Sequence, residues 1–267
     1  MNSRDQGPFQ LSLVAMNSLI AACGRGGRPD LALQVLSVMK SRYGVEPDSR
    51  SYRCAVIACN KAEHDLHRWL KMDSEASGTK SENVMVSDET VQWWECALSL
   101  LRRMREEGLI PDVATYSAAI SACDSAGEWQ RALGVLQMMI DDDRTAETNS
   151  TLLNLYCFNA AISACEKGQA WVEALELYER MLDTGEPIRP NIITLNSLLV
   201  ALENAGQKEL AQSMYREAYD RKLVNPWRRT KNEKGQMIEA MVRPRFHFLF
   251  TVVFLFHSQQ FFLIGPS

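Results

Sequence analysis

The sequence predicts an all-α protein in which about five helix-turn-helix hairpins stack as a solenoid. The first observation is an Ala-Cys dipeptide that recurs in one frame and ends at Cys23, Cys59, Cys123 and Cys165. The second is an Ala-Leu dipeptide followed at a fixed offset by methionine, at Met39, Met104, Met139 and Met181. The repeat length is close to 35 residues, as between Ala97 and Ala132. A unit of this length cannot bury its apolar face alone and must stack on neighbours.

Each unit has the apolar spacing of two amphipathic helices. In the third copy, residues at i, i+3, i+4 and i+7 are Tyr116, Ala119, Ile120 and Cys123. After a break at Gly127 the same spacing returns at Ala132, Val135, Leu136 and Met139. Two such helices joined by a short turn that contains glycine form an antiparallel hairpin.

Proline marks the ends of most copies. Pro47, Pro111 and Pro190 each come just after the expected second helix of a copy, and a helix cannot continue through proline. These ends divide the chain into a lead, a repeat region and a tail, at residues 1–12, 13–226 and 227–267. We expect the five copies at residues 13–48, 49–112, 113–154, 155–191 and 192–226.

The second copy is longer than the others because it contains an insertion, residues 65–93, in the turn between its two helices. The centre of the insertion, from Ser74 to Asn83, is polar and rich in turn-forming residues. This composition favours a disordered excursion that leaves the repeat intact.

The cysteines and tryptophans recur at fixed positions and predict packing roles. The four repeated cysteines lie on the apolar stripe of the first helix, so we expect small buried residues with reduced thiols. A second position, at the start of the second helix, carries Trp94, Trp129 and Trp171. We interpret these as packing residues between hairpins rather than platforms for stacking bases.

Two polar clusters are candidate metal sites, and we interpret both as solvated surface. One consists of His64, Asp65 and His67 without a nearby cysteine, and the other is the acidic run Asp141–Asp143. The sequence has no Cys-x-x-Cys, no Gly-rich phosphate loop and no defensible Ser-His-Asp grouping. We therefore expect neither an enzyme nor a bound metal or cofactor.

The end of the chain differs in composition from the repeats. From Phe246 to Ile264, 19 residues contain no Asp, Glu, Lys or Arg, and this stretch has seven of the nine phenylalanines. The length is enough to span a bilayer, but His257 to Gln260 interrupt the apolar run. We expect a disordered terminus or a translated non-coding stretch, with a membrane anchor as the alternative.

Three well-preserved segments, Arg103 to Asp112, Ala114 to Cys123 and Glu128 to Leu133, resemble pentatricopeptide repeats. Matches in one register extend over residues 13–226. The tetratricopeptide repeat has a similar period, but its Trp-x-x-Leu-Gly-x-x-Tyr opening does not occur here, and the Pro-Asp or Pro-Asn ending is typical of pentatricopeptide repeats. The resemblance implies a right-handed superhelical solenoid that binds single-stranded RNA, one base per repeat.

The resemblance also implies which residues select the bases. The fifth residues of the copies are Asn17, Arg53, Ser117, Asn159 and Asn196. The last residues of the first four copies are Asp48, Asp112, Asn154 and Asn191. Short polar side chains of this kind can hydrogen-bond the Watson–Crick edge of a base. The alternative is that the Asn and Ser side chains simply cap the starts of these helices.

The second residue of each copy would flank the base planes. These residues are Val14, Arg50, Ala114, Tyr156 and Ile193. Val and Ile suit this role, whereas Arg50 and Ala114 depart from it. The second copy therefore has two arginines, Arg50 and Arg53, which favour contact with phosphate over base selection.

The pairing rules of the family imply a base for three copies. Asn17 with Asp48 implies uracil, Ser117 with Asn154 implies adenine, and Asn159 with Asn191 implies a pyrimidine. The second and fifth copies are left unassigned. The expected strand is therefore U-N-A-Y-N, read 5′ to 3′.

The charge of the chain argues against nucleic acid and keeps a second function open. The net charge is −4, and because residues 228–267 contribute +4, the repeat region carries −8. RNA binding normally draws on phosphate neutralisation, so binding here would be weak and would depend on local arginines. The alternative is a non-enzymatic scaffold for protein–protein interaction with a basic partner.

The resemblance implies a role in organellar RNA processing, stability or translation, in the chloroplast or the mitochondrion. Residues 1–10 contain one arginine and one aspartate, and we do not interpret them as an Arg-rich transit peptide. The compartment is therefore an expectation from family membership alone.

Overall fold

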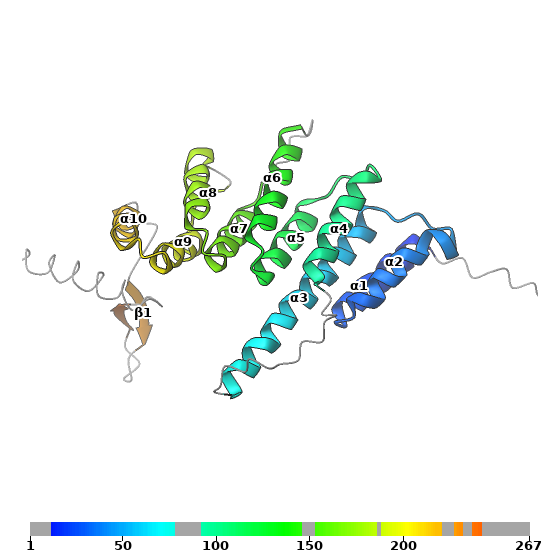
Figure 1. Ribbon diagram of the computed structural model, residues 1–267, viewed down its shortest axis with the longest axis horizontal. Helices are drawn as coiled ribbons and strands as arrows, with labels where there is room; N and C mark the ends of the chain where they lie inside the picture. Colours follow the sequence, from blue (N-terminus) through cyan, green and yellow to red (C-terminus); the bar gives the residue numbers. More distant parts are fainter. Residues whose placement is uncertain are drawn as a thin grey trace, which may run out of the picture.

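The computed structural model describes residues 12–77, 92–145, 153–185, 188–220, 227–231 and 237–241 (Figure 1). Within these ranges the helices are α1 (Leu13–Arg25), α2 (Pro29–Tyr43), α3 (Ser49–Ser77), α4 (Trp93–Glu106), α5 (Val113–Ala126), α6 (Trp129–Thr145), α7 (Leu155–Lys167), α8 (Trp171–Thr184), α9 (Ile192–Asn204) and α10 (Lys208–Asp220). Two strands follow them, β1 (Trp227–Lys231) and β2 (Met237–Met241).

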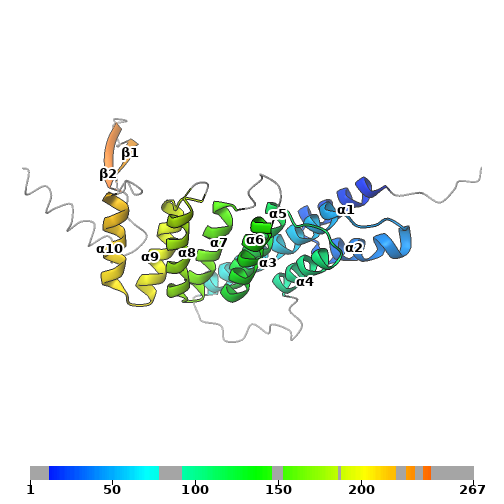
Figure 2. The same cartoon turned by 90° about the horizontal axis from the view of Figure 1, so that it is seen from above.

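The helices form five hairpins arranged in two layers. The first helices of the hairpins, α1, α3, α5, α7 and α9, lie side by side, and each packs on the next (Figure 1). Each second helix packs on the first helix of its own hairpin, and α2, α4, α6 and α8 also pack on the first helix of the following hairpin. The hairpins follow one another along the long axis of the molecule (Figure 2). The predicted solenoid of helical hairpins is confirmed.

The repeated apolar residues form one core that continues through all five hairpins. The alanines of the Ala-Leu frame are 0 or 1% exposed, at Ala32, Ala97, Ala132, Ala174 and Ala211. The methionines that follow them are fully buried, at Met39, Met104, Met139 and Met181. Each hairpin thus buries its apolar face against its neighbours, as solenoids do.

The buried position of the repeated cysteines is confirmed. Cys59, Cys123 and Cys165 are fully buried, all seven cysteines are free thiols, and Cys23 is only half-buried. Cys23 is more accessible because α1 belongs to the first described hairpin and no earlier one covers it. Burial raises the pKa of the Cys123 thiol to about 12.

The repeated tryptophans pack on the core as predicted. Trp94, Trp129 and Trp171 are half-buried and lie at or next to the first residues of α4, α6 and α8. Trp129 also reaches the turn of the following hairpin, where a Cβ added to Gly168 would lie 2.0 Å from the Trp129 ring. Glycine at residue 168 therefore gives the indole its place between the two hairpins.

The insertion of the second copy differs from the expected disordered excursion. Helix α3 continues through its first part and ends at Ser77, so residues 65–77 are helical. From Ser49 to Ser77 the sequence contains no Gly or Pro, and many of its residues favour helix, which explains why the helix continues. Residues 78–91 lie outside the described part of the chain.

No strand was expected from the sequence, but β1 and β2 form an antiparallel hairpin with Trp227 opposite Met241. The expected tail, residues 227–267, therefore begins with a β-hairpin. The apolar stretch from Phe246 to Ile264 lies outside the described residues. Among the helices that are described, none combines the length and apolarity needed to cross a bilayer.

Candidate RNA-binding edge

The last residue of a copy caps the first helix of the next copy, and in two places the capping is reciprocal. Asp48 Oδ1 accepts a hydrogen bond from the backbone N–H of Ser51 at 2.8 Å, while the Asp48 N–H donates to Ser51 Oγ at 3.1 Å. Asn191 and Thr194 form the same capping box at the start of α9, with distances of 3.0 and 3.1 Å. Both pairs have the spacing of a capping box, in which two otherwise unpaired N–H groups are satisfied.

The other two last residues, Asp112 and Asn154, also cap the helix that follows them. Asp112 Oδ1 accepts from the backbone N–H of Thr115 at 2.9 Å and from its hydroxyl at 2.7 Å. Asn154 Oδ1 accepts from the backbone N–H of Tyr156 at 2.7 Å. All four last residues are therefore fixed at the N-termini of first helices, which places them along one edge of the first layer.

The fifth residues lie inside the first helices and do not cap them. The Asn17 amide nitrogen donates to Asp48 Oδ1 at 3.1 Å, and its oxygen accepts from Ser51 Oγ at 2.5 Å. Asn159 Oδ1 accepts from Thr194 Oγ1 at 2.5 Å. The fifth residue of one copy thus contacts the start of the next copy, beside the last residue of its own.

The third residues of copies two to five, which were not predicted from the sequence, connect the fifth and last residues. They are Ser51, Thr115, Cys157 and Thr194, all fully buried. Ser117 Oγ lies 3.0 Å from Cys157 Sγ, so the thiol takes the place of the hydroxyl in the fourth copy. A signal was present, because a small Ser, Thr or Cys follows each capping Asp or Asn by three residues. We call the last, third and fifth residues together the polar row.

The second copy contains an ion pair where the others have neutral side chains. Arg53 Nη1 donates to Asp112 Oδ2 at 2.6 Å, and both side chains are partly exposed. Partial burial acts to raise the pKa of Asp112, but hydrogen bonds from Thr115 and Arg53 outweigh it and hold the pKa below its ordinary value. The charge expected to contact phosphate is therefore partly neutralised at Arg53, while Arg50 is exposed.

The second residues of all five copies are exposed. Among the apolar ones, Val14 is 69%, Tyr156 55% and Ile193 59% exposed, and Ala114 is exposed as well. These residues belong to the first turns of first helices, next to the caps. Single exposed apolar residues are common, but here they recur along one edge in every copy except the second, which has Arg50.

The fifth copy is described only in part. Asn196 is exposed within α9. The end of this copy, near residue 226, lies outside the described residues, so the partner position of Asn196 is not placed.

The described side chains contain no group of three or more His, Cys, Asp and Glu arranged to hold a metal. In the acidic run, Asp142 accepts hydrogen bonds from Arg105 Nη2 at 3.1 Å and from the Tyr116 hydroxyl. The Asp142 carboxylate of α6 therefore connects α4 and α5 through hydrogen bonds, whereas a solvated surface had been expected.

Three stretches of the chain match models of the pentatricopeptide repeat. Residues 11–61 match the PPR repeat family, residues 95–143 the pentatricopeptide repeat domain, and residues 151–185 the PPR repeat. Together these stretches cover about half of the chain, and except for residues 11 and 12 they fall within the first four copies.

Two relatives are chloroplastic pentatricopeptide repeat-containing proteins of Arabidopsis thaliana. One is 30% identical over 134 residues, which are 47% of this chain and 14% of that protein. The other is 27% identical over 116 residues, 43% of this chain and 10% of that protein. The chain thus aligns with a small part of each relative's length.

Solved structures with the same fold include two protein-only RNase P proteins of Arabidopsis thaliana. Nuclear RNase P 2 superposes with a TM-score of 0.58 at 12% identity, over 78% of this chain and 38% of that one. The pentatricopeptide repeat domain of RNase P 1, solved in complex with tRNA, superposes with a TM-score of 0.55 at 13% identity, over 84% of this chain and 95% of that one. From its repeated hairpins and these matches, the chain belongs to the pentatricopeptide repeat family.

Proposed function

We propose that this protein binds single-stranded RNA along the N-terminal edge of its first helices, with one base per repeat. The observation that carries the proposal is the recurrence, at each of the four described junctions between repeats, of a polar cluster beside an exposed second residue. Successive hairpins present these groups in the same order, as a linear ligand with a regular repeat requires. Membership of the family and the tRNA complex of the structural neighbour support RNA as that ligand.

The caps leave a second polar atom available for a base. Helix capping uses Oδ1 of Asp48, Asn154 and Asn191. No other described residue hydrogen-bonds to the amide nitrogens of Asn154 and Asn191, while the Asp48 carboxylate accepts from Asn17, Arg50 and Ser51. A carboxylate oxygen accepts from the N3–H of uracil, whereas an amide nitrogen donates to acceptors such as adenine N1. The proposed strand is U-N-A-Y-N.

The second residues are proposed to sandwich the base planes. Tyr156 and Ile193 present apolar surface at the start of consecutive first helices, and stacking of a base on an aromatic ring such as that of Tyr156 contributes about 1–3 kcal/mol. Arg50 supplies a planar guanidinium at the same position of the second copy, which can stack on a base or pair with phosphate.

We propose that the bound RNA is an organellar transcript and that binding influences its processing, stability or translation. The relatives named as chloroplastic support this compartment. The protein acts by occupying RNA and not by chemistry of its own. Crosslinking of the native protein to RNA, followed by sequencing, would identify the transcript; recovery of no RNA would contradict the assignment.

The edge itself can be tested by charge at the second residues. We expect Tyr156→Asp and Ile193→Asp to weaken binding of the full chain to a U-N-A-Y-N RNA by about tenfold each at low salt, because a carboxylate repels phosphate and removes the stacking surface. The matched control is Val172→Asp, since Val172 is 44% exposed but lies on α8 in the other layer. Equal affinities for all three variants and the wild type would contradict the proposal.

A further inference from the structure

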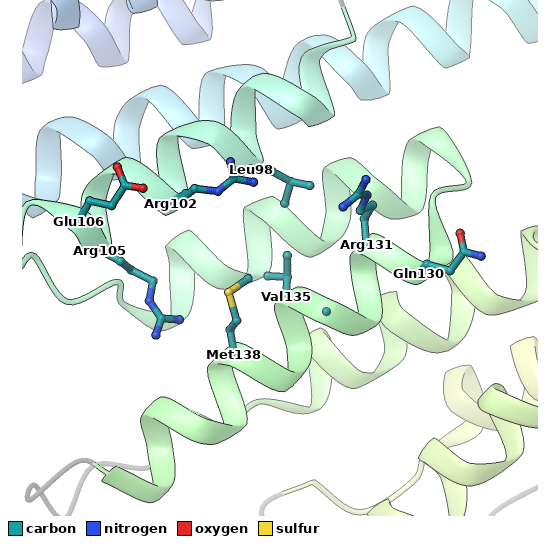
Figure 3. Close-up of a pocket in the computed structure, with 9 residues that line it drawn as sticks. Leu98, Arg102, Arg105, Glu106, Gln130, Arg131, Val135 and Met138 are labelled. Carbon is teal, nitrogen blue, oxygen red and sulfur yellow. The ribbon is translucent and has the colours of Figure 1, made fainter.

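A groove lies between α4 and α6, in the layer opposite to the polar row (Figure 3). Its volume is about 560 Å³, and both helices that form it pack on α5. Its apolar lining consists of Leu98 from α4 with Val135 and Met138 from α6. A space of this size between two second helices can accept side chains of another chain.

The groove is basic although the chain is acidic. Three arginines line it, Arg102 and Arg105 from α4 and Arg131 from α6, against one acidic residue, Glu106. Arg105 is held by Asp142 at 3.1 Å. Arg102 and Arg131 are exposed and form no ion pair with any described residue, so two guanidinium groups stand beside an apolar surface without a partner. Such groups attract carboxylates.

The residues that line the groove are not part of the repeated pattern, as a comparison of α6 with α8 shows. Ala132 of α6 and Ala174 of α8 are equivalent and equally buried. In that frame Arg131 corresponds to Glu173, and Gly134 corresponds to Glu176. The buried alanine is the same in both hairpins, whereas the basic Arg131 of the groove is replaced by the acidic Glu173 in the next hairpin.

Gly134 keeps the α6 wall of the groove flat. It lies in the middle of a helix, where glycine is unfavourable, and a Cβ added to it would meet nothing within 4 Å. Packing within the chain therefore does not explain the glycine. A missing side chain at an open surface allows the backbone or side chains of another molecule to approach closely.

We propose that this groove binds an acidic amphipathic segment of a partner protein. Carboxylates of the segment pair with Arg102 and Arg131. Its apolar side chains cover Leu98, Val135 and Met138, and one of them packs over Gly134. The apolar lining favours a polypeptide over RNA, whose backbone would leave this surface uncovered.

The test uses the full chain and a labelled amphipathic peptide built from Glu, Leu and Ala, with a second peptide carrying Lys in place of every Glu. We expect the acidic peptide to bind through the groove, whereas any binding of the basic peptide to the acidic surface should not depend on the groove residues. The double variant Arg102→Glu with Arg131→Glu should weaken binding at least about tenfold. Gly134→Gln, which fills the groove without changing charge, should weaken it as well.

The matched control for charge is Arg25→Glu with Arg42→Glu, two exposed arginines of the first hairpin, which should bind the acidic peptide like the wild type. Circular dichroism confirms that every variant is folded. Equal peptide binding by all variants, or no binding of the acidic peptide to the wild type, would overturn the proposal. Groove variants that lose U-N-A-Y-N RNA instead of the peptide would make this an RNA surface and overturn it too.

Discussion

Cys123 of α5 is fully buried, and its equivalents Cys59 and Cys165 are buried in the same way. A charge introduced there cannot be solvated. We expect Cys123→Asp to lower the free energy of unfolding by several kcal/mol, and Cys123→Ala by about 1 kcal/mol for the lost contacts. Urea unfolding followed by circular dichroism measures both. Similar midpoints for the two variants would mean that residue 123 is not in the core.

Burial of this thiol also makes stability depend on pH. Burial raises the pKa of Cys123 to about 12, above its unfolded value of about 8.5. The unfolded chain therefore loses the thiol proton first, so the contribution to stability is complete below pH 8.5 and is lost as pH rises toward 12. Between pH 9 and 11 the wild type should lose more stability than Cys123→Ala, by up to about 1.4 kcal/mol per pH unit. Parallel pH profiles would contradict the assignment.

Replacing two glycines by alanine should change the stability of the protein in opposite directions. Gly168→Ala forces a methyl group into the ring of Trp129, so we expect a loss of about 1–3 kcal/mol unless the indole moves. Gly134→Ala adds a methyl group in open space within a helix and should stabilise by about 0.5–1 kcal/mol. Thermal melting of the two variants provides the comparison, and a shift in the same direction for both would contradict the packing described here.

The polar row shows which parts of a site a repeated sequence can predict. The fifth and last residues were identifiable because the family assigns them roles and their polar character recurs. The third residues were missed, since they differ in type, as Ser51 and Cys157 do, and since their burial depends on the preceding hairpin, whose fifth residue they contact. The Arg53–Asp112 ion pair could not be predicted either, because the insertion separates the two residues by 59 positions.

At the scale of elements, the insertion of the second copy raises the question of whether the hairpin of α3 and α4 needs its long connection to fold. Glu63 is buried and accepts a hydrogen bond from the backbone N–H of Trp94 at 3.0 Å, so it caps α4 from the end of the repeat part of α3. The equivalent position in the third copy is Gly127, with a φ of 77°. A shortened turn therefore needs glycine there, which Glu63 does not provide.

We expect excision of residues 65–93, combined with Gly-Glu in place of Glu63 and His64, to leave the solenoid folded. Each doubling of loop length costs only about 0.6 kcal/mol, so a shorter turn should not lower stability. The midpoint of thermal unfolding should change by a few degrees, and helix content should fall only by the excised residues. The matched control is the same excision with Glu63 and His64 retained, which should be less stable. A molten or unfolded product in the glycine variant would show that the insertion supports the fold.

The elements that could best be predicted from the sequence are the helices with a strong periodicity of apolar residues. In copy three the break expected at Gly127 separates α5 from α6, and the expected copy boundaries at residues 112 and 154 lie just before α5 and α7. The length of α3 was underestimated, since polar residues with good helix propensity resemble a loop in composition. The pairing of β1 with β2 was not predicted, because neither strand has an alternating pattern long enough to stand out.

For the whole molecule, the structure separates two surfaces of different chemistry. The polar row and the second residues lie along the layer of first helices, and the arginine groove lies between two second helices. An acidic repeat region lacks the bulk attraction that holds most nucleic-acid-binding proteins to phosphate. In the proposed RNA complex, affinity therefore depends on base contacts and on local arginines, so we expect a change of base to change the affinity measurably.

The most direct measurement is therefore a base exchange at the third repeat. Asn154 caps α7 through Oδ1, and Asn154→Asp keeps that oxygen while replacing the amide nitrogen with an acceptor. The full chain and the variant are titrated with U-N-A-Y-N RNA and with the same RNA carrying guanine in place of adenine. We predict that the wild type prefers adenine and the variant prefers guanine, whose N1–H and N2–H₂ groups donate to a carboxylate, each by about tenfold. Binding to neither RNA, or an unchanged preference in a folded variant, would contradict base recognition along this edge.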